Sequence, residues 1–403
     1  MMSRTTRLVV LVFSLLLAAL LMTGVVWRQS GDPDNGPEKQ LGIMVEVYQH
    51  IADDYVTTPN LAKVSDGGLH GLLSSLDADS SYLNQAEYQQ YLQYQQNPPQ
   101  GHIDAVVSKR VGYADVVDVR PGGAAAQAGL VRGDFVEAIG NTGTRDMSLE
   151  QIRHELEGAP GTTVTLSVVH LHHSDPVKVT ITRGPFSMAP LKTSVTDGIG
   201  VIGVPDFDAG RAAQIASALR KFKGAGVHGL VLDLRNAGAG TYEQAVQTAN
   251  LFLDHGTITY LEGQKYPRVT TTANAADAVD TADKLIVLTN FGTYGPAELA
   301  AAALQQNQRG TVVGDGTFGE GSVQKLFPVG DGTAIWLTVA RYYSPGGKLI
   351  QDGITPDVQQ VRYAGALPDM DYAPEGVTGP QPDLQMQKAL SLLAAPAAAA
   401  AAH

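Results

Sequence analysis

Short apolar runs alternate with helix-like segments through the second half of this chain, and no other feature constrains its fold as strongly. The apolar runs lie at residues 200–204, 230–234, 285–288 and 311–313. Segments with helical spacing of apolar residues separate them, at 211–222, 242–253 and 297–306. Continuous apolar runs of this length predict buried strands, and the helices between them favour parallel pairing. The sequence therefore predicts an α/β layer built on a largely parallel sheet.

An uncharged, mostly apolar run of 20 residues occupies positions 8–27, after Arg4 and Arg7. At about 1.5 Å per residue, a helix of this length spans roughly 30 Å of hydrocarbon. The run is longer than a signal-peptide core and ends without a small-residue cleavage site, so residues 1–28 are predicted to be an uncleaved anchor rather than a removed signal. The preceding arginines favour a cytoplasmic N-terminus. The rest of the chain would then lie outside the cytoplasmic membrane, in the periplasm or at the cell surface.

Composition limits the partners that the chain can take. Asp and Glu number 40 against 28 Lys and Arg, which gives a net charge of −12. This balance argues against nucleic acid as a partner, because phosphate contacts need clustered basic residues. The chain has no cysteine, which excludes disulfides, a cysteine nucleophile and a thiolate metal site.

The remaining chain divides into five predicted regions, and its predicted fold class is α+β multidomain. A polar linker is expected at 29–40, a helical N-terminal region at 41–100, a small β-rich domain at 101–184 and the α/β core at 185–363. Residues 364–403 read as a Pro-rich stretch, a short C-terminal helix and an Ala-rich tail.

Six short motifs, in order along the chain, carry a resemblance to a known family. They are LDADSSYL at 76–83, the glycine- and alanine-rich segment 122–134, DLRNAGAG at 233–240, TFGEGSVQ at 317–324, ARYYSPGG at 340–347 and GITPD at 353–357. They are similar to LDPHSSYL, SPAxxAGLxxGD, DLRNNPGG, TFGKGSVQ, ARYYTPSG and GIxPD of the carboxyl-terminal processing peptidases, or tail-specific proteases. The resemblance implies a serine peptidase with a crotonase-like α/β core and an inserted PDZ-like domain.

The resemblance also implies a catalytic Ser–Lys dyad, in which the serine attacks the peptide carbonyl and a neutral lysine takes its proton. The family's GSASASE segment aligns with residues 292–298, which puts Gly295 at the serine position. Glu320, 25 residues later, stands at the lysine position. Gln324, which helps to hold the lysine in the family, is retained.

The oxyanion hole that the resemblance implies is altered as well. In the family the residue after the serine donates a backbone N–H, and here that residue is Pro296, which has none. A second donor comes from the glycine-rich loop, at Gly240, where Gly238 and Ala239 replace a Pro-Gly pair. Loss of one donor typically slows such a reaction by roughly 10²–10³-fold. Without nucleophile, base and donor, the chain is predicted to be an inactive homologue that binds polypeptides or a partner protease as a scaffold or regulator.

Two alternatives stay open. The chain could be an active serine-type endopeptidase that cleaves near protein C-termini with a displaced nucleophile. Thr293 and Ser322 are the candidates, although both suit turn or packing hydroxyls. Lys325 adjoins Gln324 but is expected on the opposite face of its strand. In the other alternative only the PDZ-like unit acts, and the core is a platform for oligomers.

The PDZ-like unit is expected to add an extended C-terminal tail as a strand and to hold the tail's carboxylate on backbone N–H groups. Gly101, His102 and Ile103 are the expected carboxylate loop. Arg235 and Asn236 follow a core strand, and they either shape a peptide groove or fix a loop.

No metal or cofactor is expected. The histidines His170, His172 and His173 form the one cluster of this residue type, and they fall where a solvated hairpin turn is predicted. The partners expected from the preceding points are polypeptide C-terminal tails or a partner protease, the membrane through the N-terminal helix, and further copies of the chain.

Overall fold

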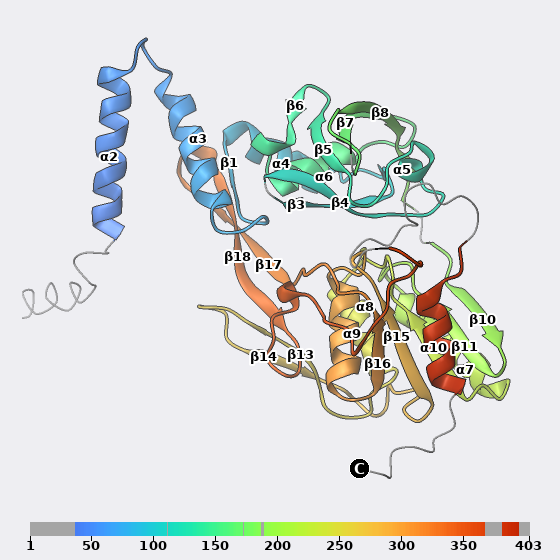
Figure 1. Cartoon of the computed structure of the whole chain (residues 1–403). Helices are drawn as coiled ribbons and strands as arrows, with labels where there is room; N and C mark the ends of the chain where they lie inside the picture. Colours follow the sequence, from blue (N-terminus) through green and yellow to red (C-terminus); the bar gives the residue numbers. More distant parts are fainter. Residues whose placement is uncertain (1–36, 111, 172, 187–188, 367–380, 395–403) are drawn as a thin grey trace, which may run out of the picture. The chain divides into compact units, whose positions relative to one another are not determined.

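The computed structural model describes residues 37–110, 112–171, 173–186, 189–366 and 381–394 (Figure 1). It divides into two compact units, Met1–Gly68 and Leu69–His403, and each is described by itself. The predicted anchor at residues 8–27 lies outside the described residues. Among the residues that are described, no helix is both long and apolar enough to cross a membrane.

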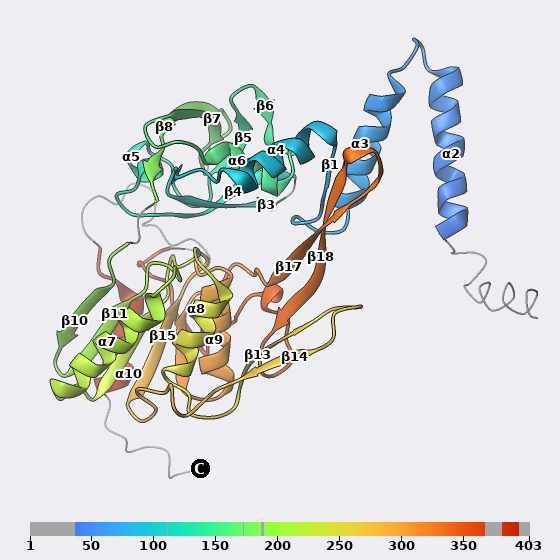
Figure 2. The same cartoon turned by 180° about the vertical axis from the view of Figure 1, so that it is seen from behind.

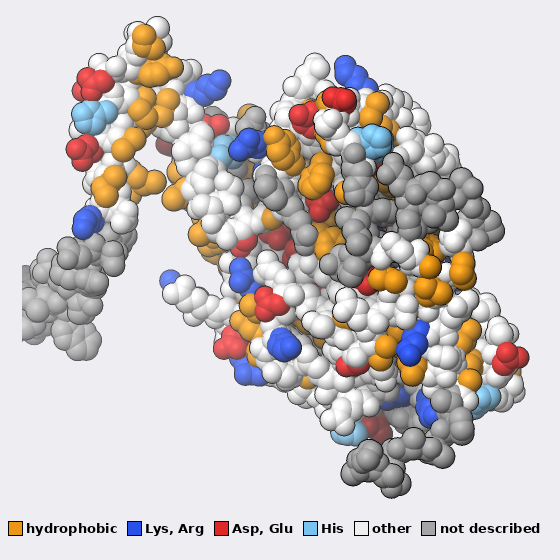
Figure 3. Space-filling model, viewed as in Figure 1, with side chains coloured by type: hydrophobic (Ala, Val, Ile, Leu, Met, Phe, Trp, Pro, Cys, Tyr) orange, Lys and Arg blue, Asp and Glu red, His pale blue; other side chains and the backbone are white. Residues whose placement is uncertain are grey.

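Two helices form the described part of the first unit. Helix α2 (Pro37–Asp54) begins inside the predicted linker, which therefore ends by residue 36 rather than at 40. Proline suits the first turn of a helix because its missing N–H has no partner there in any case. Helix α3 (Leu61–Ser74) starts in this unit, and the Tyr48 hydroxyl donates to the Leu61 carbonyl oxygen over 3.1 Å. Figure 3 shows hydrophobic side chains gathered along α2.

The core of the second unit is the expected α/β layer, a six-stranded sheet in the order β10-β11-β12-β15-β16-β19. All neighbours pair in parallel except β10 and β11. The strands are β10 (Lys192–Thr196), β11 (Ile199–Gly203), β12 (Gly229–Asp233), β15 (Lys284–Thr289), β16 (Gly310–Gly314) and β19 (Val358–Gln359).

Helices cover both faces of this sheet, as Figure 2 shows from behind. Side chains alternate between faces along a strand, so Leu230 and Leu232 of β12 pack toward one set of helices and Val231 toward another. The helices on the first face are α7 (Arg211–Gly224), α8 (Tyr242–Asn250) and α9 (Pro296–Gln306). Helix α10 (Leu384–Ala394) covers the second face with Ala389 and Leu393.

A second sheet joins distant parts of the chain. Its order is β1-β18-β13-β14, with β17 paired to β18 as a hairpin. Its strands are β1 (Ser81–Leu83), β13 (Thr257–Glu262), β14 (Val269–Thr272), β17 (Ser322–Pro328) and β18 (Ala334–Tyr343). Strand β1 belongs to the LDADSSYL motif, and Tyr82 pairs with Ile335 of β18. Helix α4 (Gln85–Gln96) follows directly, with a capping box between Asn84 and Glu87.

The β-rich domain contains the sheet β3-β4-β5-β7-β8, with β6 on β5 and a separate β2–β9 pair. Its strands are β2 (Gly101–His102), β3 (Ala105–Arg110), β4 (Tyr113–Val119), β5 (Phe135–Ile139), β6 (Thr142–Gly143), β7 (Thr163–Val169), β8 (Val177–Thr182) and β9 (Gly184–Pro185). Its helices are α5 (Ala124–Gln127) and α6 (Leu149–Leu156), and α6 packs Leu149, Ile152 and Leu156 into the domain core. Strand β3 stands at the edge of the sheet.

Candidate active site

The turn between β15 and α9 positions the first candidate residue. Gly295 adopts φ +52° and ψ −107°, a left-handed conformation that is strained for residues with a side chain. The turn before it is rigid, because the Thr293 hydroxyl donates to the Leu234 carbonyl oxygen over 2.9 Å and also accepts from the Asn290 N–H. A sharp strand-to-helix turn of this kind is the setting in which many hydrolases expose a nucleophile.

Glu320 lies near Gly295, as the resemblance to the family's Ser–Lys dyad implies. A Cβ added to Gly295 would meet the Tyr242 hydroxyl at 3.4 Å and the Glu320 Cγ at 4.0 Å. The Tyr242 hydroxyl donates to the Glu320 carbonyl oxygen over 3.0 Å. Burial raises the pKa of Tyr242 well above its ordinary value, so this hydroxyl stays a neutral donor. The space where a side chain at position 295 would project is therefore faced by a phenol and a carboxyl group.

The first turn of α9 is tied to the Glu320 segment by Glu298, which is fully buried. Its Oε2 accepts the N–H groups of Gly295 and Glu320, both over 2.8 Å. Its Oε1 accepts the Gly319 N–H over 2.7 Å and the Thr317 hydroxyl. Burial raises the pKa of Glu298 to about 8, while these donors act in the opposite direction.

Pro296 and Gly240, the residues at the two oxyanion-donor positions, lie in different surroundings. Pro296 is the first residue of α9 and offers no N–H next to Gly295. Gly240 lies against Phe207, since an added Cβ would come within 2.1 Å of the Phe207 carbonyl carbon. Gly238 of the glycine-rich loop approaches the turn, with its added Cβ 3.2 Å from the Tyr294 Cβ.

Ser322 sits between two carboxyl groups, an arrangement that sequence reasoning missed. Its Oγ lies 2.5 Å from Glu320 Oε1 and 3.0 Å from Asp79 Oδ2. The Gln324 amide donates to the same Oγ over 2.7 Å. The retained Gln324 thus touches Ser322, two residues away on one strand face. Asp79 is 243 residues away in sequence, and its only signal was that it replaces the histidine of the LDPHSSYL motif.

The two hydroxyl alternatives now differ. Thr293 is fully buried and its hydroxyl is engaged in the hydrogen bonds of the turn, as expected of a packing residue. Ser322 is 9% exposed and is bonded to a carboxyl group. The Lys325 ammonium lies 5.2 Å from the centre of the Phe327 ring, which places both on one strand face, opposite Gln324.

Comparison with known proteins decides the family. The sequence pattern of peptidase family S41 matches residues 198–360, and that of a PDZ domain matches residues 116–169. The carboxy-terminal-processing protease of Bartonella bacilliformis is 31% identical over 326 residues, which are 79% of this chain and 75% of that protein. The chain belongs to the carboxyl-terminal processing protease family.

One further relative agrees with this assignment, and one solved structure shows the same fold. The carboxyl-terminal-processing protease of Synechocystis sp. is 35% identical over 280 residues, 68% of this chain and 63% of that protein. The solved structure of a photosystem II D1 C-terminal processing protease is 24% identical and has a TM-score of 0.65. It covers 81% of this chain and 94% of that chain, and it shows the mixed α/β fold with a PDZ domain.

The PDZ domain of this family member uses the three expected carboxylate-loop residues for packing. Gly101 has no room for a side chain, because an added Cβ would lie 2.5 Å from the Gly184 carbonyl oxygen. The Ile103 side chain is 1% exposed in the domain core. His102 stacks on Phe186 and its Nε2 lies 3.2 Å from Asp104. Binding at this loop would therefore use backbone groups.

Arg235 and Asn236 line a cavity of about 280 Å³ beside the ends of β11 and β12, but both are engaged in fixing the chain. Arg235 makes two hydrogen bonds with the Asp383 carboxylate, 2.8 and 2.9 Å long, and also pairs with Asp233. Asn236 accepts the side-chain N–H groups of Asn290 over 2.7 Å and Arg132 over 3.2 Å. Both residues thus fix the loop that follows β12. Their part in a peptide groove, for which the cavity offers space, stays a prediction.

The histidine segment does not gather metal ligands in the described part of the chain, where no group of three His, Asp or Glu side chains is arranged to hold a metal ion. His170 Nδ1 lies 3.0 Å from Asp134, so it is paired rather than only solvated. His172 lies outside the described residues.

Proposed function

We propose that this chain is a catalytically inactive processing-protease homologue that captures polypeptide C-terminal tails. The observation that carries the proposal is the strained turn at Gly295, which presents no side chain to Glu320. A covalent peptidase mechanism needs a nucleophile at that turn and a neutral base beside it. Pro296 also removes an oxyanion donor, so the three losses fall on one site.

The binding half of the proposal is supported by the PDZ domain. Strand β3 is an edge strand, and helix α6 lies beside it with its Leu149, Ile152 and Leu156 buried in the domain core. An extended peptide can add to such an edge by main-chain hydrogen bonds. This is the kind of surface that takes a polypeptide tail.

The experiment is a paired cleavage and binding assay on the purified full-length chain. The substrate is an unstructured protein with an apolar C-terminus, and the binding probe is its last ten or so residues with a free or an amidated C-terminus. We expect no cleavage, and tighter binding of the free carboxylate. Equal binding of both peptides would overturn the capture role.

Restoring the family's serine and lysine tests the proposed lack of catalytic activity. We expect Gly295→Ser with Glu320→Lys to give weak cleavage, and the further change Pro296→Ala to raise it by roughly 10²-fold through the recovered N–H. Cleavage by the native chain that persists through repurification would overturn inactivity.

A second candidate function is favoured by one contact. The Ser322 hydroxyl lies 2.5 Å from the Glu320 carboxyl, which is the reach of a nucleophile and its base. If the native chain cleaves, Ser322→Ala should abolish the activity and Thr293→Ala should leave its catalytic step intact. The reverse result would remove Ser322 from consideration.

We also propose that residues 8–27 anchor the chain in the cytoplasmic membrane with the described units outside the cytoplasm. A partner protease or further copies of the chain would be recruited there. Protease protection of spheroplasts tests the topology, since digestion from outside is expected to remove the soluble part. Light scattering of the detergent-solubilised chain tests self-association.

A further inference from the structure

The three side chains Asp79, Ser322 and Glu320 form a hydrogen-bonded row that the functions above do not require. Asp79 lies just before β1, and Ser322 is the first residue of β17. The row therefore joins the LDADSSYL segment to the hairpin strand that follows Glu320. Asp79 is 6% exposed, so the row has little access to water.

The hydrogen bonds of this row need one carboxyl proton, which would be absent if Asp79 and Glu320 were both ionised. The Ser322 Oγ carries one hydrogen and has three close partners, namely Glu320, Asp79 and the Gln324 amide. With the amide donating, the hydroxyl donates to one carboxylate and must accept from the other. If the amide oxygen faced Ser322 instead, still more carboxyl protons would be needed. Either arrangement requires at least one protonated carboxyl group.

The second contact of Glu320 assigns that proton. Glu320 Oε1 also accepts the Ser322 N–H over 3.2 Å, so this oxygen is an acceptor twice over. The proton then belongs on Asp79 Oδ2, which donates to Ser322 Oγ over 3.0 Å. The other oxygen, Asp79 Oδ1, lies 3.7 Å from Arg153. The chain of donors runs from Asp79 through Ser322 to Glu320.

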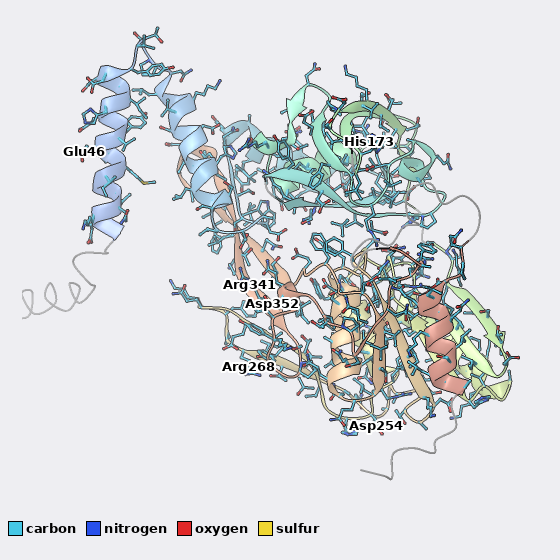
Figure 4. The ribbon with its side chains drawn as sticks, viewed as in Figure 1. Glu46, His173, Asp254, Arg268, Arg341 and Asp352 are labelled. Carbon is cyan, nitrogen blue, oxygen red and sulfur yellow. The ribbon has the colours of Figure 1, made fainter. Side chains whose placement is uncertain are left out.

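The charged and titratable groups around the row come from several elements packed on it. They are Asp77 in the same turn, Glu150 and Arg153 of α6, Tyr242 of α8, Tyr294 before α9, Glu298 of α9, which accepts the Glu320 N–H, and Arg341 of β18, labelled in Figure 4. Arg341 is 3.8 Å from Asp77, and Arg153 is 37% exposed. Burial raises the pKa of both Asp79 and Glu320, and Arg153 only partly opposes this.

We propose that the shared proton is a pH-dependent lock that holds the 76–83 segment on β17. Loss of the proton would leave two carboxylates on either side of one hydroxyl that can donate to only one of them. The unsatisfied carboxylate and the like-charge repulsion would then loosen the segment, including its pairing with β18. The lock acts whether or not the chain cuts peptides.

Hydrogen–deuterium exchange on the full-length chain tests the lock. After correction for intrinsic exchange rates, we expect protection of the peptide covering 76–83 to fall about tenfold between roughly pH 5 and pH 8, as one lost hydrogen bond implies. Asp79→Asn should keep this protection constant, because its amide donates permanently to Ser322. Asp254→Asn, at an exposed aspartate labelled in Figure 4, is the matched control and should behave as the native chain.

A constant protection in the native chain, or a pH dependence unchanged in Asp79→Asn, would overturn the lock. Glu320→Gln is the second variant, since it leaves a single ionisable carboxyl in the row and should also flatten the profile. Infrared difference spectra supply a readout that needs no unfolding. The native chain minus Asp79→Asn should show a protonated-carboxyl band near neutral pH, and its absence would equally overturn the proposal.

Discussion

Glu298 shows how a single buried carboxyl group can fix two chain segments at once. Its two oxygens accept two donors each, from the first turn of α9 and from the segment 317–320. Three of these donors are backbone N–H groups, and that of Gly295 is buried. The shape of the turn at Gly295 therefore depends on this one residue.

We expect Glu298→Gln to lower the stability of the chain by about 1–3 kcal/mol, because the amide, whichever way it is turned, puts its NH2 group against at least one backbone N–H that needs an acceptor. Thermal denaturation of the variant measures the loss. Glu243→Gln, at an exposed position of α8, should leave the melting temperature unchanged. A Glu298→Gln variant as stable as the native chain would show that the donors have other partners.

Helix α10 is held at its start by an element-scale contact that the sequence did not reveal. Asp383 precedes the helix, and its Oδ1 accepts the Met386 N–H over 3.0 Å as an N-terminal cap. The same carboxylate pairs with Arg235, whose side chain is 6% exposed. Arg235 thus links the end of β12 to helix α10, which covers the face of the sheet opposite α7, α8 and α9.

Asp383→Asn should cost about 2 kcal/mol, since asparagine keeps the cap but leaves Arg235 with Asp233 as its one charged partner, beside the Gln385 side chain. The pKa of Asp383 is lowered: burial raises it, but Arg235, the Met386 N–H and Arg362 together outweigh burial. A lowered carboxyl pKa stabilises the fold above the ordinary value of 3.8 and ceases to do so as the pH falls through the folded-state pKa. Melting curves should therefore separate the variant from the native chain at neutral pH and converge below about pH 4. An equal difference at all pH values would argue against the ion pair.

At the scale of the whole molecule, buried carboxyl groups of raised pKa lie in both domains of the second unit. Burial raises the pKa of Asp118 in the PDZ domain to about 7, although Arg132 opposes it, and that of Glu298 in the core to about 8. A folded chain in which carboxyl pKa values are raised binds protons more tightly than the unfolded chain. Its stability therefore falls as the pH rises through this range.

We expect the melting temperature to drop by roughly 5 °C or more between about pH 5 and pH 8. Scanning calorimetry across this range checks the sign. Asp118→Asn should remove the part of the drop that belongs to the PDZ domain. A melting temperature that stays constant across this range would mean that these groups ionise as easily in the folded chain as in the unfolded one, and a rise would mean that they ionise more easily in the folded chain.

Sequence reasoning reached the elements that local patterns determine. The strands β11, β12, β15 and β16 and the helices between them follow from apolar periodicity, and helix α4 lies in the predicted helical region 41–100. The resemblance to the Ser–Lys dyad implied that Gly295 and Glu320 face each other. The contact of Asp79 with Ser322 and that of Arg235 with Asp383 escaped prediction, because the partners lie 243 and 148 residues apart. No periodicity encodes a contact between two loops at that separation.

The backbone at position 295 bears on the history of this chain. An L-residue side chain at φ +52° costs roughly 1–2 kcal/mol, and glycine avoids that cost. On the proposed function, a change from serine to glycine at this position would have gained stability as it removed the hydroxyl. A return to serine would lose that stability and would yield no cleavage until position 320 had changed as well. Selection for a folded protein would then hold the glycine in place.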